Sequence, residues 1–329
     1  MKDIAAYCRV SRSTVSRVIN GDPNVKERTR QKVLDAIEAL GYRPNRIAQG
    51  LKHGRYSFAG VVVDQMSDIT SVIIQEIERC CRAAGYTLAL CIARDDPSSV
   101  SVWIEENAYV EGIVYLMGGI HEIPWNCPEA IPSVFAYCFP RGTRENCIYP
   151  DNVQGASDAV RYLLGLGHRR IAYVNGPPRW EAHRSRLAGY LQAMAEAGAH
   201  VDEAWIVEGN GSFESGVRLG HQLLSLPAGR RPTAIFACSD RMAAGVMAAA
   251  RERGMAVPEE LSVVGYENRE FAEYLSPKLT TVHLPLKEVG TLAAGRLFDA
   301  IQNNRHEPWP ETKVGCRLVV RGSAGPPAS

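Results

Sequence analysis

The sequence has 329 residues, of which 46% are hydrophobic and 22% are charged, so it predicts two or three globular domains and excludes wholesale disorder. It has no apolar run of about 18 residues, no apolar h-region at its N-terminus and no CxxC pair among its nine cysteines. We therefore expect no membrane span, no secretory signal, no disulfide framework and no zinc ribbon, which fits a reducing cytoplasm.

The net charge of +1 is distributed unevenly along the chain. Residues 1–58 contain 12 Lys and Arg against 5 Asp and Glu, a net charge of +7, so the rest of the chain has a net charge of −6. A basic segment on a mildly acidic body predicts an anionic partner for that segment alone. Nucleic acid is the first candidate, because phosphates attract clustered Lys and Arg. A solvated basic arm without a partner is the alternative.

Three short helices are predicted in residues 1–44. The first covers Lys2–Cys8. Ser11 is a natural N-cap for a second helix that ends near Asn20, and a third helix runs from about Lys26 to Leu40, where Gly41 is placed to end it. Two short helices joined by a tight turn at residues 9–11 predict a helix-turn-helix, whose second helix enters the major groove of DNA.

The second predicted helix has one apolar and one polar face. Val15 and Val18 face inward beside Val10. The opposite face has no acidic side chain and consists of Arg12, Ser13, Ser16, Arg17 and Asn20. Arg can bond guanine in a bidentate manner, and Ser and Asn can reach base edges or phosphates, so this face predicts groove contacts. A plain three-helix bundle with an accidental polar face is the alternative.

Five motifs in this region carry a family resemblance: D-I-A at 3–5, V-S-x-x-T-V-S-R-V-I-N at 10–20, T-R-x-K-V at 29–33, G-Y-x-P-N at 41–45 and A-x-x-L at 48–51. The region thereby resembles the N-terminal domain of the lac repressor/galactose repressor family of bacterial transcription regulators. One departure is Arg9, where the turn often has glycine. The resemblance implies base readout from Arg12, Ser13 and Arg17, with Thr14 close to the DNA backbone. It also implies phosphate contacts from Ser16, Asn20, Thr29 and Tyr42.

A fourth helix is predicted from Asn45 to about His53, directly after Pro44. A helix of about nine residues with an internal glycine is marginal in water, so we expect it to be disordered off DNA and ordered on it. The resemblance implies that two such helices pair across a dimer axis in the minor groove, where Leu51 wedges into the central base step beside Asn45 and Ala48. A flexible linker with an incidental leucine is the alternative.

Strands and helices alternate over residues 58–322. The predicted strands lie at about 59–63, 87–92, 112–117, 132–137, 171–174, 205–207, 234–237 and 261–264, and the helices at about 73–84, 100–107, 152–166, 184–197, 213–226 and 241–254. This alternation indicates parallel sheets covered on both faces. Since eight to ten strands are more than one small sheet needs, we expect two doubly wound lobes with a cleft between them.

Sequence fingerprints of an enzyme are absent. The patterns GxGxxG, GxxxxGK[ST], GxSxG and HExxH do not occur, and no cluster of His, Asp and Glu has metal-ligand spacing. We therefore predict no enzyme activity, no cofactor and no metal. Two alternatives remain: a solute-binding module that does not regulate DNA, and a Rossmann-type enzyme.

The same family resemblance extends through the body, at 155–174, 186–190, 213–216, 239–245, 261–266 and 276–282. It implies a dimeric, periplasmic-binding-protein-like effector domain with a small molecule between its lobes. Ligand contacts in such sheets come from the C-terminal ends of strands. Carried over by position, the candidates are Asp64, Asp68, Thr70, Tyr137, Arg186, Ser239 and Glu267.

Several of these positions depart from the usual family pattern. Tyr137 stands where many sugar-binding members have Asp, Ser239 replaces the common Asn, and Glu267 replaces the common Asp. The usual stacking aromatic is missing at position 211, so Trp180 or Phe213 would have to supply it. A sugar is the first expectation for the ligand. A sugar acid stays open because three arginines are expected nearby: Arg179, Arg184 and Arg241.

The predicted domains are a helix-turn-helix head at 1–44, a hinge at 45–57, an effector and dimerisation body at 58–322 and a disordered tail at 323–329. The fold class is an all-α head on an α/β body of two doubly wound parallel-sheet lobes. The predicted function is a cytoplasmic, nucleoid-associated homodimer that binds a pseudo-palindromic DNA operator and acts most simply as a repressor. A sugar or sugar acid between the lobes would control its affinity.

Overall fold

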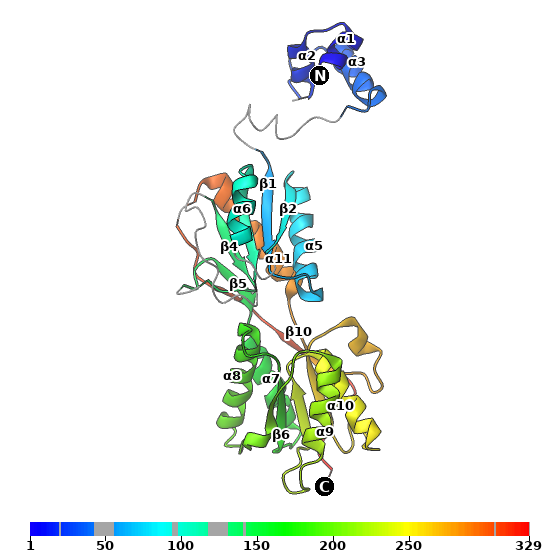
Figure 1. The fold of residues 1–329 in the computed structure, drawn as a ribbon, viewed down its shortest axis with the longest axis vertical. Coiled ribbons are helices and arrows are strands. Elements are labelled where there is room, and N and C mark those ends of the chain that lie inside the picture. The colour runs from blue at the N-terminus through cyan, green and yellow to red at the C-terminus, as the bar shows by residue number, and fades with distance from the viewer. Residues whose placement is uncertain are drawn as a thin grey trace. The chain divides into compact units, whose positions relative to one another are not determined.

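The computed structural model describes residues 1–19, 21–42, 56–93, 98–117, 131–140, 143–305 and 307–328. The chain divides into two compact units, residues 1–57 and 58–329 (Figure 1). The predicted hinge helix and its Asn45, Ala48 and Leu51 lie outside the described residues, as does Asn20.

The first unit contains the three predicted helices, α1 (Lys2–Cys8), α2 (Arg12–Ile19) and α3 (Glu27–Ala39). They surround a small core of Ile4, Ala5, Cys8, Val15, Val18, Val33 and Ala36. Arg9 ends α1 in the left-handed region, with a φ of 50°. This conformation suits glycine, which explains why glycine is common at this turn in the family that the sequence resembles.

The second unit consists of two lobes, each built on a six-stranded sheet (Figure 1). In the first lobe the strand order is β11-β5-β4-β3-β1-β2 and every pair is parallel. Its elements are β1 (Phe58–Val63), α5 (Asp68–Ala83), β2 (Thr87–Ile92), α6 (Ser98–Glu106), β3 (Val110–Leu116), β4 (Ser133–Ala136), β5 (Cys147–Pro150), α11 (Leu286–Asn303) and β11 (Thr312–Val314).

The second lobe has the strand order β12-β10-β9-β8-β6-β7, in which only the β10–β12 pair is antiparallel. Its elements are α7 (Asn152–Gly165), β6 (Ile171–Asn175), α8 (Glu181–Glu196), η1 (Glu203–Trp205), β7 (Ile206–Glu208), α9 (Phe213–Leu224), β8 (Ala234–Ala237), α10 (Asp240–Glu252), β9 (Ser262–Glu267), η2 (Glu270–Glu273), β10 (Thr280–His283) and β12 (Arg317–Val319). The prediction of two doubly wound lobes is therefore confirmed.

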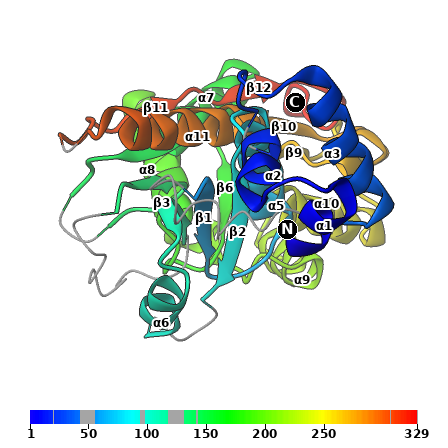
Figure 2. The same cartoon turned by 90° about the horizontal axis from the view of Figure 1, so that it is seen from above.

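Helices cover both faces of each sheet because alternate strand residues point to opposite sides. In the first lobe Val61 and Val63 pack under α5 and α11, whereas Val62 packs with α6 on the other face. Seen from above, α11 and α6 lie on opposite sides of this sheet (Figure 2). In the second lobe the close approach of α9 and α10 requires glycine, because a Cβ on Gly216 would lie 2.3 Å from the Met242 carbonyl oxygen.

Three connections join the lobes, from β5 to α7, from β10 to α11 and from β11 to β12. The C-terminal ends of the central strands therefore face the space between the lobes, where a doubly wound sheet binds ligands.

The helix predicted from Ile73 in fact starts at Asp68. A capping box explains the extra turn: the Ser67 N–H donates to Thr70 Oγ1 (2.8 Å) and the Thr70 N–H to Ser67 Oγ (3.2 Å).

The prediction of a disordered tail at 323–329 is wrong for residues 323–328. Ser323 is fully buried, donates to the Val263 carbonyl oxygen (2.6 Å) and accepts from the Thr280 N–H (2.8 Å). The Gly325 N–H donates to Ser262 Oγ (3.0 Å). The small residues of the tail thus satisfy backbone groups at the edge of the second-lobe sheet, which composition alone does not reveal.

Candidate functional site

The first unit presents the predicted polar face of α2. Val15 and Val18 are buried, and on the opposite side Arg12, Ser13 and Arg17 are exposed. Thr14, Ser16, Thr29 and Tyr42 are half-buried. Exposed guanidinium and hydroxyl groups on one side of a short helix are the groups that contact DNA bases and phosphates.

Local capping sets the start of this helix. The Thr14 N–H donates to Ser11 Oγ (3.1 Å), and the Ser11 hydroxyl also lies 2.7 Å from that of Ser13. At the other end Arg17 Nε lies 3.8 Å from Asp22 Oδ2, and the Asn24 N–H helps to lower the pKa of Asp22. Arg17 thus keeps an exposed side chain beside one weak ionic partner.

The second unit contains a cavity of about 70 Å³ between its lobes. Its walls are formed by Asp64, Gln65, Ser67, Ile69, Thr70, Leu116, Tyr137, Trp180, Ala182, His183, Arg186 and Glu267. Asp64, Tyr137 and Glu267 stand at the C-terminal ends of β1, β4 and β9, as the sheet rule requires. The volume holds a few water molecules and is below the roughly 300–1,000 Å³ of common ligand pockets, so a larger ligand requires the lobes to separate.

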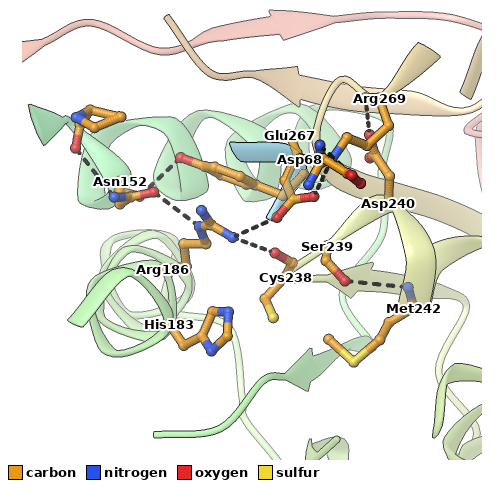
Figure 3. A network of polar contacts seen from close by, with 12 residues as sticks. Asp68, Asn152, His183, Arg186, Cys238, Ser239, Asp240, Met242, Glu267 and Arg269 are labelled. Carbon is orange, nitrogen blue, oxygen red and sulfur yellow. Dashed lines mark hydrogen bonds and ion pairs between the residues drawn. The ribbon is translucent and has the colours of Figure 1, made fainter. Parts of the chain in front are cut away.

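Arg186 is the central polar residue of this cavity and is fully buried (Figure 3). Its Nε donates to Asn152 Oδ1 (2.9 Å) and its Nη1 to the Cys238 carbonyl oxygen (2.6 Å). Its Nη2 donates across the cleft to Tyr137 Oη (3.1 Å). Burial raises the pKa of Tyr137, so the phenol stays neutral and accepts this bond.

Two further contacts balance the charge of Arg186. Nη1 lies 3.9 Å from Glu267 Oε1, and the guanidinium carbon lies 4.1 Å from the centre of the Tyr266 ring. Arg269 Nε also donates a hydrogen bond to Glu267 Oε2 (2.8 Å) and forms an ion pair with it. Tyr137 and Glu267 have positive φ values of 59° and 109°, which non-glycine residues adopt at a cost that often marks functional positions.

Trp180 and His183 form an aromatic wall of the same cavity. Their rings stack at 5.9 Å between centres with 19° between planes. His183 Nδ1 lies 3.0 Å from the Pro177 carbonyl oxygen, and burial, together with the charge of Arg186, lowers the pKa of His183 to about 4. Of the two aromatics considered from the sequence, Trp180 lines the cavity, whereas Phe213 is an exposed side chain elsewhere.

Five of the seven predicted ligand residues line the cavity and two do not. Asp68 is instead paired across the cleft with Arg241 (Oδ2–Nη2, 2.8 Å) and Arg269 (Oδ2–Nη1, 3.4 Å). Ser239 is the N-cap of α10, where its Oγ accepts from the Met242 N–H at 3.3 Å. Sequence reasoning missed His183, Gln65, Ser67, Ile69, Leu116 and Ala182. Some of them stand directly after a strand or at the start of a helix, and this position could have indicated that they line the cavity.

The Asp240 carboxylate is buried and contacts Arg269, the residue that also pairs with Asp68. It accepts from the Arg269 N–H (2.6 Å; Figure 3) and from Thr281 Oγ1 (2.5 Å). Burial nevertheless raises the pKa of Asp240 to about 7. Through its hydrogen bonds Asp240 ties α10 to the crossover strand β10 and to the segment that holds Glu267.

Within the described ranges no three His, Cys, Asp or Glu side chains come together to hold a metal ion. In the same part of the chain, no helix combines the length and apolarity needed to cross a membrane.

Two family models match the chain. Residues 1–45 match "Bacterial regulatory proteins, lacI family", and residues 160–324 match "Periplasmic binding protein-like domain". The chain is 35% identical over 315 residues to the HTH-type transcriptional repressor PurR of Vibrio campbellii, covering 93% of each protein. It is 34% identical over 328 residues to catabolite control protein A of Priestia megaterium, covering 98% of each.

Solved structures agree with this match. A lac repressor dimer bound to operator and the anti-inducer ONPF has a TM-score of 0.87 at 28% identity, over 98% of both chains. A complex of the transcriptional regulator CelR with cellobiose has a TM-score of 0.72 at 30% identity, again over 98% of both chains.

Proposed function

Because this chain belongs to the lacI family of bacterial regulatory proteins, a family of DNA-binding repressors controlled by effectors, we propose that it binds its operator as a homodimer and that a sugar or sugar acid between its lobes controls that binding. It is a transcription repressor and not an enzyme. The proposed divisions are the head at 1–44, the hinge at 45–57 and the body at 58–322.

The exposed face of α2 is the observation that carries the DNA-binding part. Arg12, Ser13 and Arg17 are exposed on the side opposite the buried Val15 and Val18, in a segment of net charge +7 (residues 1–58). A dimer doubles this charge and favours a pseudo-palindromic site with one half for each head. Since the lac repressor is a dimer on its operator, the same arrangement is proposed for this chain, in the cytoplasm beside the nucleoid.

The effector part rests on the interlobe cavity. Its lining combines carboxylates, an amide, hydroxyls and a guanidinium with one aromatic wall, which suits a small polar ligand with several hydroxyl groups. The complex of CelR with cellobiose supports a sugar as the class of ligand. Binding between the lobes would change their orientation and so the spacing of the two heads.

The test is a titration of the full-length protein with an operator selected from random duplexes, over a series of salt concentrations. The logarithm of the association constant should fall linearly with the logarithm of salt concentration, with a slope of about −0.9 per phosphate contacted. The double variant with both Arg12→Ala and Arg17→Ala should bind the operator no better than a random duplex. An affinity that does not change with salt would contradict the proposal.

A further inference from the structure

A second cavity, of about 460 Å³, opens on the second lobe at the end away from the first lobe. Arg169 and Arg170 directly precede β6, and Arg230 lies shortly before β8, so the cavity is at the N-terminal ends of these parallel strands. Its volume is within the roughly 300–1,000 Å³ of common ligand pockets. This distal crevice is lined by Arg169, Arg170, Gly198, Ala199, His200, Asp202, Trp205, Gly229 and Arg230.

The lining of the distal crevice is positively charged. It has three guanidinium groups and one carboxylate, that of Asp202. Arg230 already neutralises this carboxylate, because its Nε donates to Oδ2 and its Nη2 to Oδ1, both at 2.7 Å. Among the described residues no carboxylate pairs with Arg169 or Arg170. The lining therefore has a net charge of +2 before His200 is counted.

Backbone carbonyl groups hold the two arginines in place. Arg169 Nη1 donates to the His168 carbonyl oxygen (2.9 Å). Arg170 Nε donates to the Arg231 carbonyl oxygen (2.8 Å). Within the described part of the chain, these bonds leave Nη2 of Arg169, both Nη atoms of Arg170 and Nη1 of Arg230 without an acceptor. Because each guanidinium group is fixed on one side, its other donors are presented to a bound anion at a lower entropic cost.

An anion with several terminal oxygens fits these donors. A carboxylate offers two oxygens, whereas a phosphate group offers three and a diphosphate offers more, and guanidinium groups bond such oxygens in a bidentate manner. Two charges without a carboxylate partner also match the multiple negative charge of a diphosphate. The exposed imidazole of His200, whose ring centre lies 6.1 Å from that of the buried Trp205, adds a ring at the rim of the crevice.

We propose that the distal crevice is a second ligand site, which binds the diphosphate group of a small molecule through Arg169, Arg170 and Arg230. The site is separate from the interlobe cavity and does not depend on the proposed effector. Free pyrophosphate and a nucleoside diphosphate share this chemistry. They differ in the base, which would lie against the exposed ring of His200.

The test is a calorimetric titration of the full-length protein with pyrophosphate, ADP and citrate at low salt. Pyrophosphate should saturate the site with a dissociation constant that rises with salt, and citrate, which has only carboxylates, should bind about tenfold more weakly. A dissociation constant several-fold lower for ADP would identify a nucleotide as the ligand, and an equal or higher one the free diphosphate. No pyrophosphate binding at millimolar concentration, or binding no stronger than that of citrate, would overturn the proposal.

Two double variants locate the binding in the crevice rather than in the basic segment 1–58. Arg169→Gln with Arg170→Gln should raise the dissociation constant for pyrophosphate about tenfold or more. Arg218→Gln with Arg251→Gln is the matched control. It removes the same charge from exposed positions of the same lobe outside the crevice, and should change the constant by less than about twofold. Equal effects of the two double variants would show general attraction of anions and would overturn the site.

A third double variant, Arg169→Lys with Arg170→Lys, keeps the charge and removes the planar fork of donors. It should weaken pyrophosphate binding several-fold while the thermal unfolding midpoint stays within a few degrees. Affinity equal to that of the unaltered protein would contradict the guanidinium contacts. Binding of a random DNA duplex should be the same for the unaltered protein and the Lys variant. A parallel loss of duplex binding would make the crevice a DNA contact and overturn the small-molecule site.

Discussion

Asp68 in the first turn of α5 and Arg241 in the first turn of α10 join the two lobes by an ion pair of 2.8 Å, although 173 residues separate them in the chain. Arg269 adds a second contact to the same carboxylate at 3.4 Å. The pair lies outside the cavity, whereas the hydrogen bond from Arg186 to Tyr137 joins the two lobes inside it.

Breaking this pair should have a small, salt-dependent effect on stability. Asp68 and Arg241 are both more than half exposed, and such pairs contribute about 0.2–1 kcal/mol. A double-mutant cycle with Asp68→Asn and Arg241→Gln, measured by urea unfolding at low and high salt, should give a coupling energy in this range that shrinks with salt. Zero coupling at low salt would mean that the contact does not hold the lobes in solution.

Arg186→Ala should destabilise the second unit strongly. It leaves Asn152 and the Cys238 carbonyl oxygen without a donor and removes one of the two guanidinium groups beside the largely buried Glu267, which costs about 3–5 kcal/mol. Arg184→Ala, two residues earlier on the exposed side of the same helix, is the control and should stay within about 0.5 kcal/mol. A loss below about 1 kcal/mol for Arg186→Ala, measured by urea unfolding, would contradict the buried network.

His183 should make stability fall with acidification. Its pKa is about 4 in the folded protein, below the 6.5 of an unperturbed histidine, so between these values the unfolded chain binds a proton that the folded chain does not. The free energy of unfolding therefore decreases as pH falls from about 6.5 to about 4, by up to about 3 kcal/mol from this residue.

The measurement is urea unfolding across this pH range for the unaltered protein and for His183→Asn, which keeps a donor near the Pro177 carbonyl oxygen. His168 and His283 also have lowered pKa values from burial, and both proteins contain them. The difference between the two pH profiles therefore reports His183. Parallel profiles would show that its imidazole is not held neutral.

Ser323→Ala should lower the free energy of unfolding by about 1–3 kcal/mol, because it leaves the buried Thr280 N–H without an acceptor. Pro326→Ala, an exposed change in the same tail, serves as the control and should have almost no effect. If both variants unfold like the unaltered protein, the tail does not pack on the sheet.

Arg17→Ala should weaken operator binding by about 1–3 kcal/mol and relax the base preference at one operator position. Thr29→Ala should weaken binding to all sequences alike, because a phosphate contact carries no sequence information. Both effects are read from titrations of the full-length protein with a set of single-base operator variants. A uniform loss for both substitutions would show that the recognition face is assigned wrongly.

Local sequence patterns determined the elements of this protein. The spacing of Val15 and Val18 determined which side of α2 is buried, because helical periodicity is a local property. Alternation of strands and helices was enough to predict two covered parallel sheets, and the motif resemblance placed Arg186 and Tyr137 between the lobes, where they line the cavity. The short strands β5, β10, β11 and β12 escaped prediction, since three or four residues carry little periodicity and pair only through distant partners. The helix α11 was not predicted either.

Tertiary structure decided what the individual polar side chains do. Position along the chain made Asp68 a ligand candidate, but Arg241 and Arg269, brought close only by the packing of the two lobes, take its carboxylate. The tail composition predicted disorder, but the Ser323 hydroxyl is held by two buried hydrogen bonds, one donated to the Val263 carbonyl oxygen and one accepted from the Thr280 N–H. A local pattern determines which elements form, whereas the partner of a polar group depends on residues far away in sequence, and only the folded arrangement brings them within bonding distance.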